Sequence, residues 1–95
     1  MPRRRAPEAQ PSSAELLRRF GANFRVARQR ANLTQQDISE RTGRGQAYVS
    51  AIERGAQNIT VETMAELAAA VNANVTELLG TTEPNPRAKP KAPRT

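Results

Sequence analysis

The stretch RTGRGQAYVSAIERG, residues 41–55, points most directly to the fold of this chain. Gly43 and Gly45 suit a tight turn, because glycine adopts left-handed backbone angles at no steric cost and can also cap a helix. Val49 and Ile52 follow three residues apart, the spacing of side chains on one helical face. The stretch therefore predicts a glycine turn, followed by a short helix with a buried side.

Capping signals on both sides of this stretch predict four more helices. Ser12 and Glu15 stand at the spacing of a capping box, in which each side chain satisfies a free backbone N–H at the helix start. Apolar residues then recur at helical spacing up to Ala27. The expected helices run over about residues 13–30 and about residues 46–54, with three others capped by Thr34, Thr60 and Asn74.

The remaining sequence indicates one small all-α domain with two tails. All seven prolines lie near the ends of the chain, in segments with almost no large apolar residues. Such segments cannot bury enough surface to fold. We therefore expect a compact five-helix domain at residues 12–80, a disordered basic arm at residues 1–11 and a disordered basic, proline-rich tail at residues 81–95.

Composition excludes several classes of function. The chain has no cysteine and no histidine, which removes most zinc sites, thiol nucleophiles and imidazole bases. We expect no catalytic residues, no metal and no cofactor, and hence no enzyme. No apolar run approaches the length of a membrane span, so we expect a cytoplasmic, nucleoid-associated protein with no membrane partner.

The net charge of +6 is unevenly distributed. Eight arginines between positions 18 and 54 outweigh Asp37, Glu40 and Glu53, whereas the other folded segments are acidic. A basic half of a small domain suits an oriented encounter with a polyanion. Solvated surface charge alone would also account for this distribution.

A short capped helix, a glycine turn and a second short helix form a helix-turn-helix, whose second helix can enter the DNA major groove. The segments FGANFRVARQRANLTQQDISERTGRGQAYVSAIERG and ITVETMAELAAAVNANVTELL, within residues 20–79, carry a resemblance to a known family. The sequence resembles the Cro/C1-type (XRE-like) helix-turn-helix transcriptional regulators. The resemblance implies a lambda-repressor-like fold that binds double-stranded DNA.

The resemblance also implies roles for single residues. Arg28 and Glu53 match a structural ion pair that holds the recognition helix, while Val49 and Ile52 match its buried face. Gln35 matches a position that contacts phosphate and braces the first recognition residue. The base-facing positions are Gln46, Ala47, Ser50 and Ala51, where Ser50 would contact base or phosphate. Further DNA contacts are expected from Arg44, Tyr48, Arg54 and Asn58, although Tyr48 would equally suit a partner subunit.

Two functions follow from this pattern. The first is a sequence-specific transcriptional regulator, a repressor that binds a palindromic operator as a homodimer, because one small module makes too few base contacts for genomic specificity. Val75, Leu78 and Leu79 are the candidate dimer interface, unless the two leucines close the core instead. The alternative is an antitoxin or a bridging protein-interaction module that also binds DNA and folds its tails on a protein partner.

Overall fold

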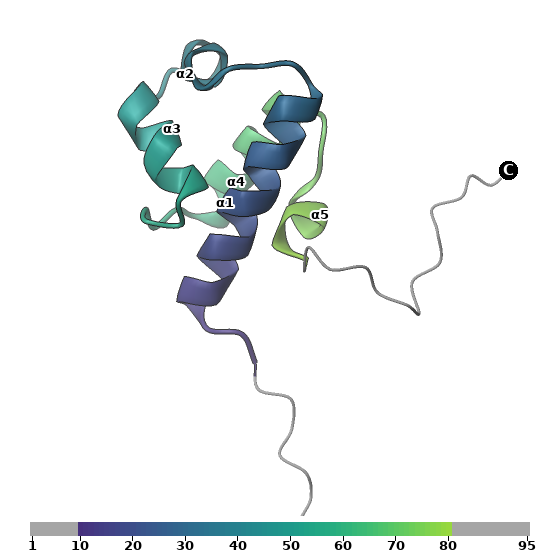
Figure 1. Cartoon of the computed structure of the whole chain (residues 1–95). Coiled ribbons are helices and arrows are strands. Elements are labelled where there is room, and N and C mark those ends of the chain that lie inside the picture. The colour runs from purple at the N-terminus through teal and green to yellow at the C-terminus, as the bar shows by residue number, and fades with distance from the viewer. Residues whose placement is uncertain (1–9, 81–95) are drawn as a thin grey trace, which may run out of the picture.

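The computed structural model describes residues 10–80, which form five helices (Figure 1). Within this range no residue is in a strand, so the all-α prediction is confirmed. Residues 1–9 and the tail predicted at residues 81–95 lie outside the described part of the chain. The helices are α1 (Ser13–Arg30), α2 (Gln35–Thr42), α3 (Gln46–Glu53), α4 (Val61–Ala70) and α5 (Val75–Leu79).

Local side-chain caps begin α2, α4 and α5. The Thr34 hydroxyl accepts a hydrogen bond from the Asp37 N–H at 2.9 Å, and the Asp37 carboxylate accepts one from the Thr34 N–H at 2.7 Å. The same reciprocal box, between Asn74 and Glu77, begins α5. Thr60 caps α4 through its hydroxyl alone. These helices start where the sequence predicts because each cap is satisfied within one turn.

The box predicted at the start of α1 is only half formed. The Ser12 hydroxyl accepts from the Glu15 N–H at 3.0 Å, as expected. The Glu15 carboxylate, however, accepts from Arg18 at 2.9 Å and from Arg19 at 3.2 Å. These two arginines lie three and four residues further along the same helix, where an ion pair with the carboxylate is favourable. The helix still begins at the predicted residue.

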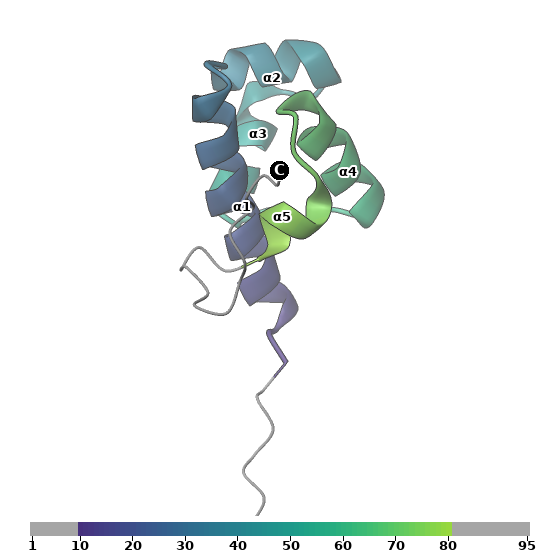
Figure 2. The same cartoon turned by 90° about the vertical axis from the view of Figure 1, so that its right-hand side faces the viewer.

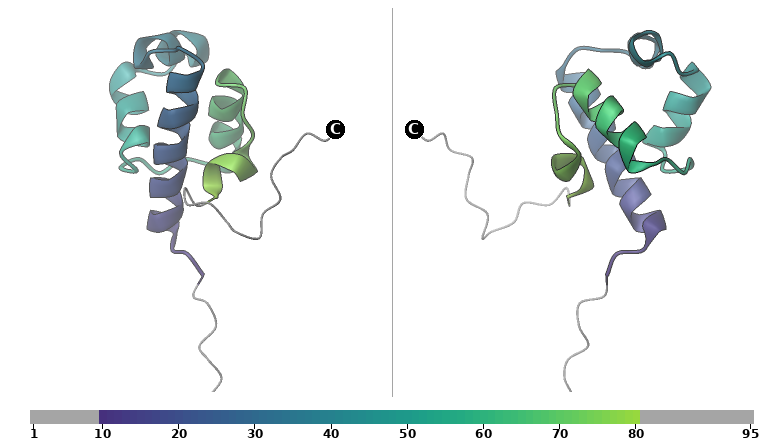
Figure 3. Two further views of the ribbon diagram at one scale, coloured as in Figure 1. Left: turned by 45° about the vertical axis from the view of Figure 1, so that its right-hand side comes forward. Right: turned by 180° about the vertical axis from the view of Figure 1, so that it is seen from behind.

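α1 is the longest helix, and the other four are arranged around it (Figures 1 and 2). α3 and α5 both pack against α1, and they lie on opposite sides of it in Figure 1. α4 lies behind α1 in that view and packs against α2 and α5, as the two views of Figure 3 also show. This arrangement leaves one side of α2 and α3 at the surface of the domain.

Ten apolar side chains form the core, and every one of the five helices contributes at least one. The rings of Phe20 and Phe24 stack with their centroids 6.0 Å apart. Leu78 is only 3% exposed, so this residue closes the core and does not offer a dimer surface as predicted. The buried set is Phe20, Phe24, Ile38, Val49, Ile52, Met64, Leu67, Ala68, Val71 and Leu78.

The turn between α2 and α3 is held by side chains of α2. Gly43 has φ 75°, in the left-handed region predicted for it. The Ser39 hydroxyl donates to the Arg44 carbonyl oxygen at 2.5 Å, and the Thr42 hydroxyl accepts from the Arg44 N–H at 3.3 Å. Gly45 caps α3 without a side-chain hydrogen bond. The backbone at the start of α3 is therefore fixed relative to α2.

Candidate nucleic-acid interface

The closest approach of α3 to α1 is at Gly21. A Cβ atom at this position would lie 2.2 Å from the Ile52 carbonyl oxygen and 2.9 Å from that of Glu53. Only a residue without a side chain therefore allows the end of α3 to lie so near α1. Our sequence reading missed Gly21, although a glycine inside a helical pattern signals such a packing constraint.

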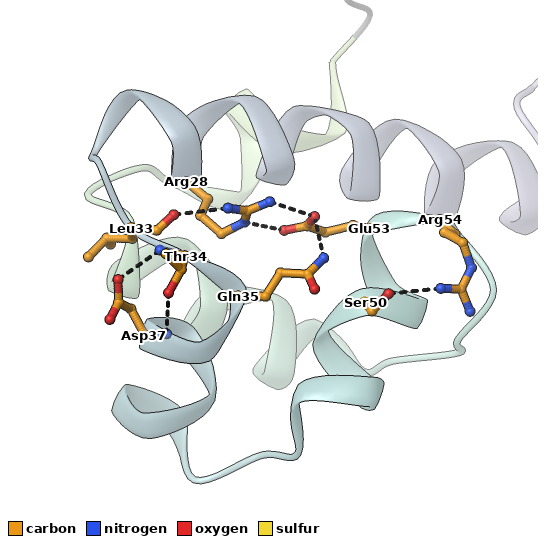
Figure 4. Close-up of polar contacts among 8 residues, drawn as sticks. All are labelled: Arg28, Leu33, Thr34, Gln35, Asp37, Ser50, Glu53 and Arg54. Carbon is orange, nitrogen blue, oxygen red and sulfur yellow. Dashed lines mark hydrogen bonds and ion pairs between the residues drawn. The ribbon is translucent and has the colours of Figure 1, made fainter.

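Arg28 and Glu53 form an ion pair between α1 and the end of α3 (Figure 4). Arg28 Nε lies 2.6 Å from Glu53 Oε2, and Arg28 Nη2 lies 3.0 Å from Glu53 Oε1. The third nitrogen, Nη1, donates to the Leu33 carbonyl oxygen at 2.9 Å. The hydrogen bonds that Arg28 donates to the Glu53 carboxylate raise the pKa of Arg28. With 11% and 4% of the two side chains exposed, loss of either partner would leave a poorly solvated charge.

Gln35 joins this ion pair from the first turn of α2. Its amide Nε2 donates to Glu53 Oε1 at 3.0 Å (Figure 4). The resemblance implied that Gln35 braces the first recognition residue, Gln46. Its amide nitrogen instead binds the carboxylate at the far end of α3, so the side chain links α2 to α3. Arg28, Gln35 and Glu53 thus connect three helices in one polar cluster.

The predicted base-facing residues of α3 all lie outside the core. Val49 and Ile52 are buried, whereas Gln46 and Ala47 are exposed at the start of the helix. Ser50 and Ala51 are half-buried. The structure thus places the four predicted residues on the accessible sides of α3, with the most exposed pair at its N-terminal end.

Arg54 and Asn58 follow α3 and are both exposed. Arg54 caps the helix, so α3 ends one residue earlier than predicted. The Arg54 Nη1 donates to the Ser50 hydroxyl oxygen at 2.8 Å (Figure 4). This contact places a guanidinium beside Ser50, outside the core and near the end of α3.

Arg44 differs from its predicted arrangement. The position of Arg44 at the start of α3 predicted a contact with DNA phosphate, although the family usually has an apolar residue there, but its Nη2 lies 2.8 Å from Oε1 of Glu66 on α4. Its guanidinium also lies over the Tyr48 ring, 5.5 Å from the centroid. The hydrogen bond that Arg44 donates to the Glu66 carboxylate raises the pKa of Arg44. This arginine is therefore already paired within the domain, through a residue that our sequence reading did not single out.

α5 lies on the other side of α1 from the recognition helix. Of its three predicted interface residues, Val75 and Leu79 are half-buried, while Leu78 is in the core. Asn23, which our sequence reading also missed, anchors the end of α5: its Nδ2 donates to the carbonyl oxygens of Leu78 at 2.8 Å and Gly80 at 2.9 Å. α5 is thus held in place by α1.

The described residues contain neither a metal cluster nor a membrane-spanning helix. Within residues 10–80, no group of three or more His, Cys, Asp or Glu side chains is placed to hold a metal ion. In the same part of the chain, no helix has the length and apolar character needed to cross a membrane.

Comparison with known proteins identifies the class. The family model of the helix-turn-helix domain matches residues 19–79, which span all five helices apart from the first six residues of α1. The chain belongs to the helix-turn-helix family of DNA-binding transcriptional regulators, as the resemblance implied.

Individual relatives and solved structures agree with this assignment. The chain is 38% identical over 72 residues to the uncharacterized HTH-type transcriptional regulator y4dJ of Sinorhizobium fredii, covering 76% of this chain and 94% of that protein. It is 32% identical over 73 residues to the control protein C.SmaI of Serratia marcescens, covering 77% and 87%. It also resembles the restriction-modification controller protein C.AhdI of Aeromonas hydrophila, with a TM-score of 0.61, 31% identity, and coverage of 65% and 94%.

Proposed function

We propose that this regulator binds a two-fold symmetric operator as a homodimer, reads bases through α3 and represses transcription. The observation that carries the proposal is the docking of α3. The close approach at Gly21 and the Arg28–Glu53 ion pair hold its C-terminal end against α1. Its N-terminal end then presents Gln46 and Ala47 to solvent. A recognition helix contacts base edges through its N-terminal residues in this way.

The proposed DNA contacts are of two kinds, to the edges of the bases and to the phosphates. Gln46 is suited to adenine, because a side-chain amide pairs with two atoms on the major-groove edge of that base. Ala47 and Ala51 allow close approach and suit contact with a thymine methyl group. Arg54, Asn58 and Tyr48 surround this surface and suit phosphate contacts, which position the protein without reading sequence. Ser50 shares its hydroxyl with Arg54, which favours a phosphate contact for this serine.

The homodimer follows from the small size of the recognition surface. A helix of eight residues reads too few base pairs to select one site in a genome, and two copies on inverted half-sites double the number. With Leu78 in the core, Val75 and Leu79 remain as interface candidates on α5. We also propose salt-sensitive phosphate contacts for the basic segments at residues 1–11 and 81–95.

Selection of bound sites from random DNA duplexes tests this function. We expect an enriched site with two inverted half-sites, whose centres lie about 10 base pairs apart or at a multiple of that spacing. The Gln46→Ala variant should relax base preference at one position in each half-site, because it loses the amide that reads the base. Enrichment of a single half-site would contradict the dimer, and no enrichment would contradict the function.

A further inference from the structure

Glu66 connects the turn of the helix-turn-helix to a helix outside it. Arg44 directly precedes Gly45, the N-cap of the recognition helix, and its guanidinium binds Glu66 on α4 at 2.8 Å. The two residues are 22 positions apart in the chain. An arginine at the start of α3 would otherwise be well placed for the DNA backbone. Its charge is instead held by a carboxylate.

This ion pair differs from the Arg28–Glu53 pair in strength. Arg28 uses all three guanidinium nitrogens, whereas Arg44 Nε is buried and has no hydrogen-bond partner. The side chains of Arg44 and Glu66 are 30% and 43% exposed, against 11% and 4% for the other pair. A partly exposed ion pair with a single hydrogen bond is more easily exchanged for another anion than a buried pair with two hydrogen bonds.

The surroundings of Arg44 leave its side chain room to move. Its backbone is fixed by Ser39 and Thr42. A Cβ atom at either flanking glycine, Gly43 or Gly45, would meet no atom within 4 Å. Arg44, the two glycines and Tyr48 line an open hollow of about 330 Å³. Without the carboxylate on α4, the guanidinium keeps only its contact with the Tyr48 ring, and the hollow gives it space to turn toward a DNA strand at the start of α3.

We propose that Glu66 sets the DNA affinity of this protein by holding Arg44 on α4, away from the phosphate backbone. The inference rests on the proposed function, in which the N-terminal end of α3 faces the duplex. It revises the role expected for Arg44, which becomes a withheld phosphate contact. Glu66 acts through Arg44 and is a positioning residue, so it contacts no DNA itself.

Removal of one negative charge tests the proposal. The Glu66→Gln variant of the full chain keeps the size of the side chain but releases Arg44. Binding to the duplex recovered by random selection is measured by fluorescence anisotropy at several salt concentrations between about 50 and 200 mM. We expect several-fold tighter binding at the lowest salt, and a slope of log affinity against log salt that is steeper by about 0.9, the value for one added phosphate contact.

Glu62→Gln is the matched control. Glu62 is exposed on the same helix, four residues before Glu66. Loss of its charge changes the net charge of the protein, and hence its long-range electrostatic attraction to DNA, by a similar amount. Its slope should equal that of the unmodified protein. The Arg44→Ala change should leave the slope of the unmodified protein unaltered. In the double variant, Arg44→Ala should abolish the tighter binding expected for Glu66→Gln, because the released guanidinium is then missing.

Several outcomes would overturn the proposal. Equal slopes for Glu66→Gln and Glu62→Gln would show that Glu66 acts only as a general charge. Tighter DNA binding by the double variant, which lacks Arg44, would also contradict the proposal. Weaker DNA binding by a Glu66→Gln protein that unfolds at an unchanged temperature would contradict it as well. These results leave the proposed function standing if the unmodified protein binds the selected duplex. If no duplex is recovered by selection, the proposed function fails and this inference fails with it.

Discussion

Gly21 shows how one residue sets the position of the recognition surface. Glycine inside a helix costs about 1 kcal/mol relative to alanine, and Gly21 lies near the middle of α1. In return, the carbonyl groups of Ile52 and Glu53 come close enough for Arg28 to reach the Glu53 carboxylate with two nitrogens. The glycine and the ion pair therefore support the same contact between α1 and α3.

We predict that Gly21→Ala destabilises the protein despite the better helix propensity of alanine. The added Cβ would lie 2.2 Å from a backbone oxygen that has no freedom to rotate away. Overpacking of this kind costs about 1–3 kcal/mol. Urea unfolding should show a lower midpoint, and DNA binding should weaken because α3 is displaced.

Gly80→Ala is the control for this change. A Cβ at Gly80 would make ordinary contacts, at 3.7 Å from the nearest atoms, and its φ of −77° suits any residue. Its free energy of unfolding should change by less than about 0.5 kcal/mol, which is typical of surface sites. Equal stability of the two variants would contradict the role assigned to Gly21.

At the scale of the element, the turn before α3 contains two glycines with different functions. Gly43 ends α2 with φ 75°, which side chains rarely adopt, while Gly45 begins α3 with φ −67° and ψ 152°. Gly43 is thus required by the backbone. Gly45 is not, and α3 is the one helix among the five whose cap makes no side-chain hydrogen bond.

Serine at these two positions should therefore have opposite effects. Gly43→Ser should destabilise by about 1–2 kcal/mol, the cost of a left-handed conformation for a residue with a Cβ. Gly45→Ser should stabilise by about 0.5–1 kcal/mol, because serine supplies the missing cap and restricts the unfolded chain. Urea unfolding of both variants measures the difference. Midpoint shifts in the same direction would contradict this account of the turn.

For the whole molecule, the titrating groups set how stability depends on pH. Hydrogen bonds from Thr34 hold the pKa of Asp37 below its ordinary value of 3.8. Hydrogen bonds from Arg18 and Arg19 hold the pKa of Glu15 below 4.5. Because both are lowered by folding, the unfolded chain binds more protons in this range, and stability rises with pH. The chain has no histidine to titrate near neutral pH.

We predict that the melting temperature is nearly constant between about pH 7.5 and 5.5 and falls as the pH drops below about 4.5, where these carboxylates gain protons. Thermal unfolding followed by circular dichroism measures the profile. The Asp37→Asn variant keeps an acceptor for the Thr34 N–H but has no carboxylate to titrate at this position. Its melting temperature should therefore fall less steeply at acid pH. A decline that begins near neutral pH in the unmodified protein would contradict this prediction.

The sequence by itself determined the helices and the turn, because the interactions that define them are local. The caps at Thr34, Thr60 and Asn74 each act within three residues, and the left-handed turn at Gly43 is a property of one residue. Apolar spacing likewise identified which face of α3 is buried. The resemblance added the Arg28–Glu53 pair, whose members are 25 positions apart. No local pattern would have joined them.

Only the tertiary structure decided which distant groups meet. Whether Leu78 closes the core or faces solvent depends on where α5 lies against α1. Arg44 pairs with Glu66 because α4 packs beside α2, and a pattern of residues does not show which carboxylate an exposed arginine will reach. Packing of helices is set by the fit of side chains over long sequence separations, so these contacts emerge only once the whole domain is assembled.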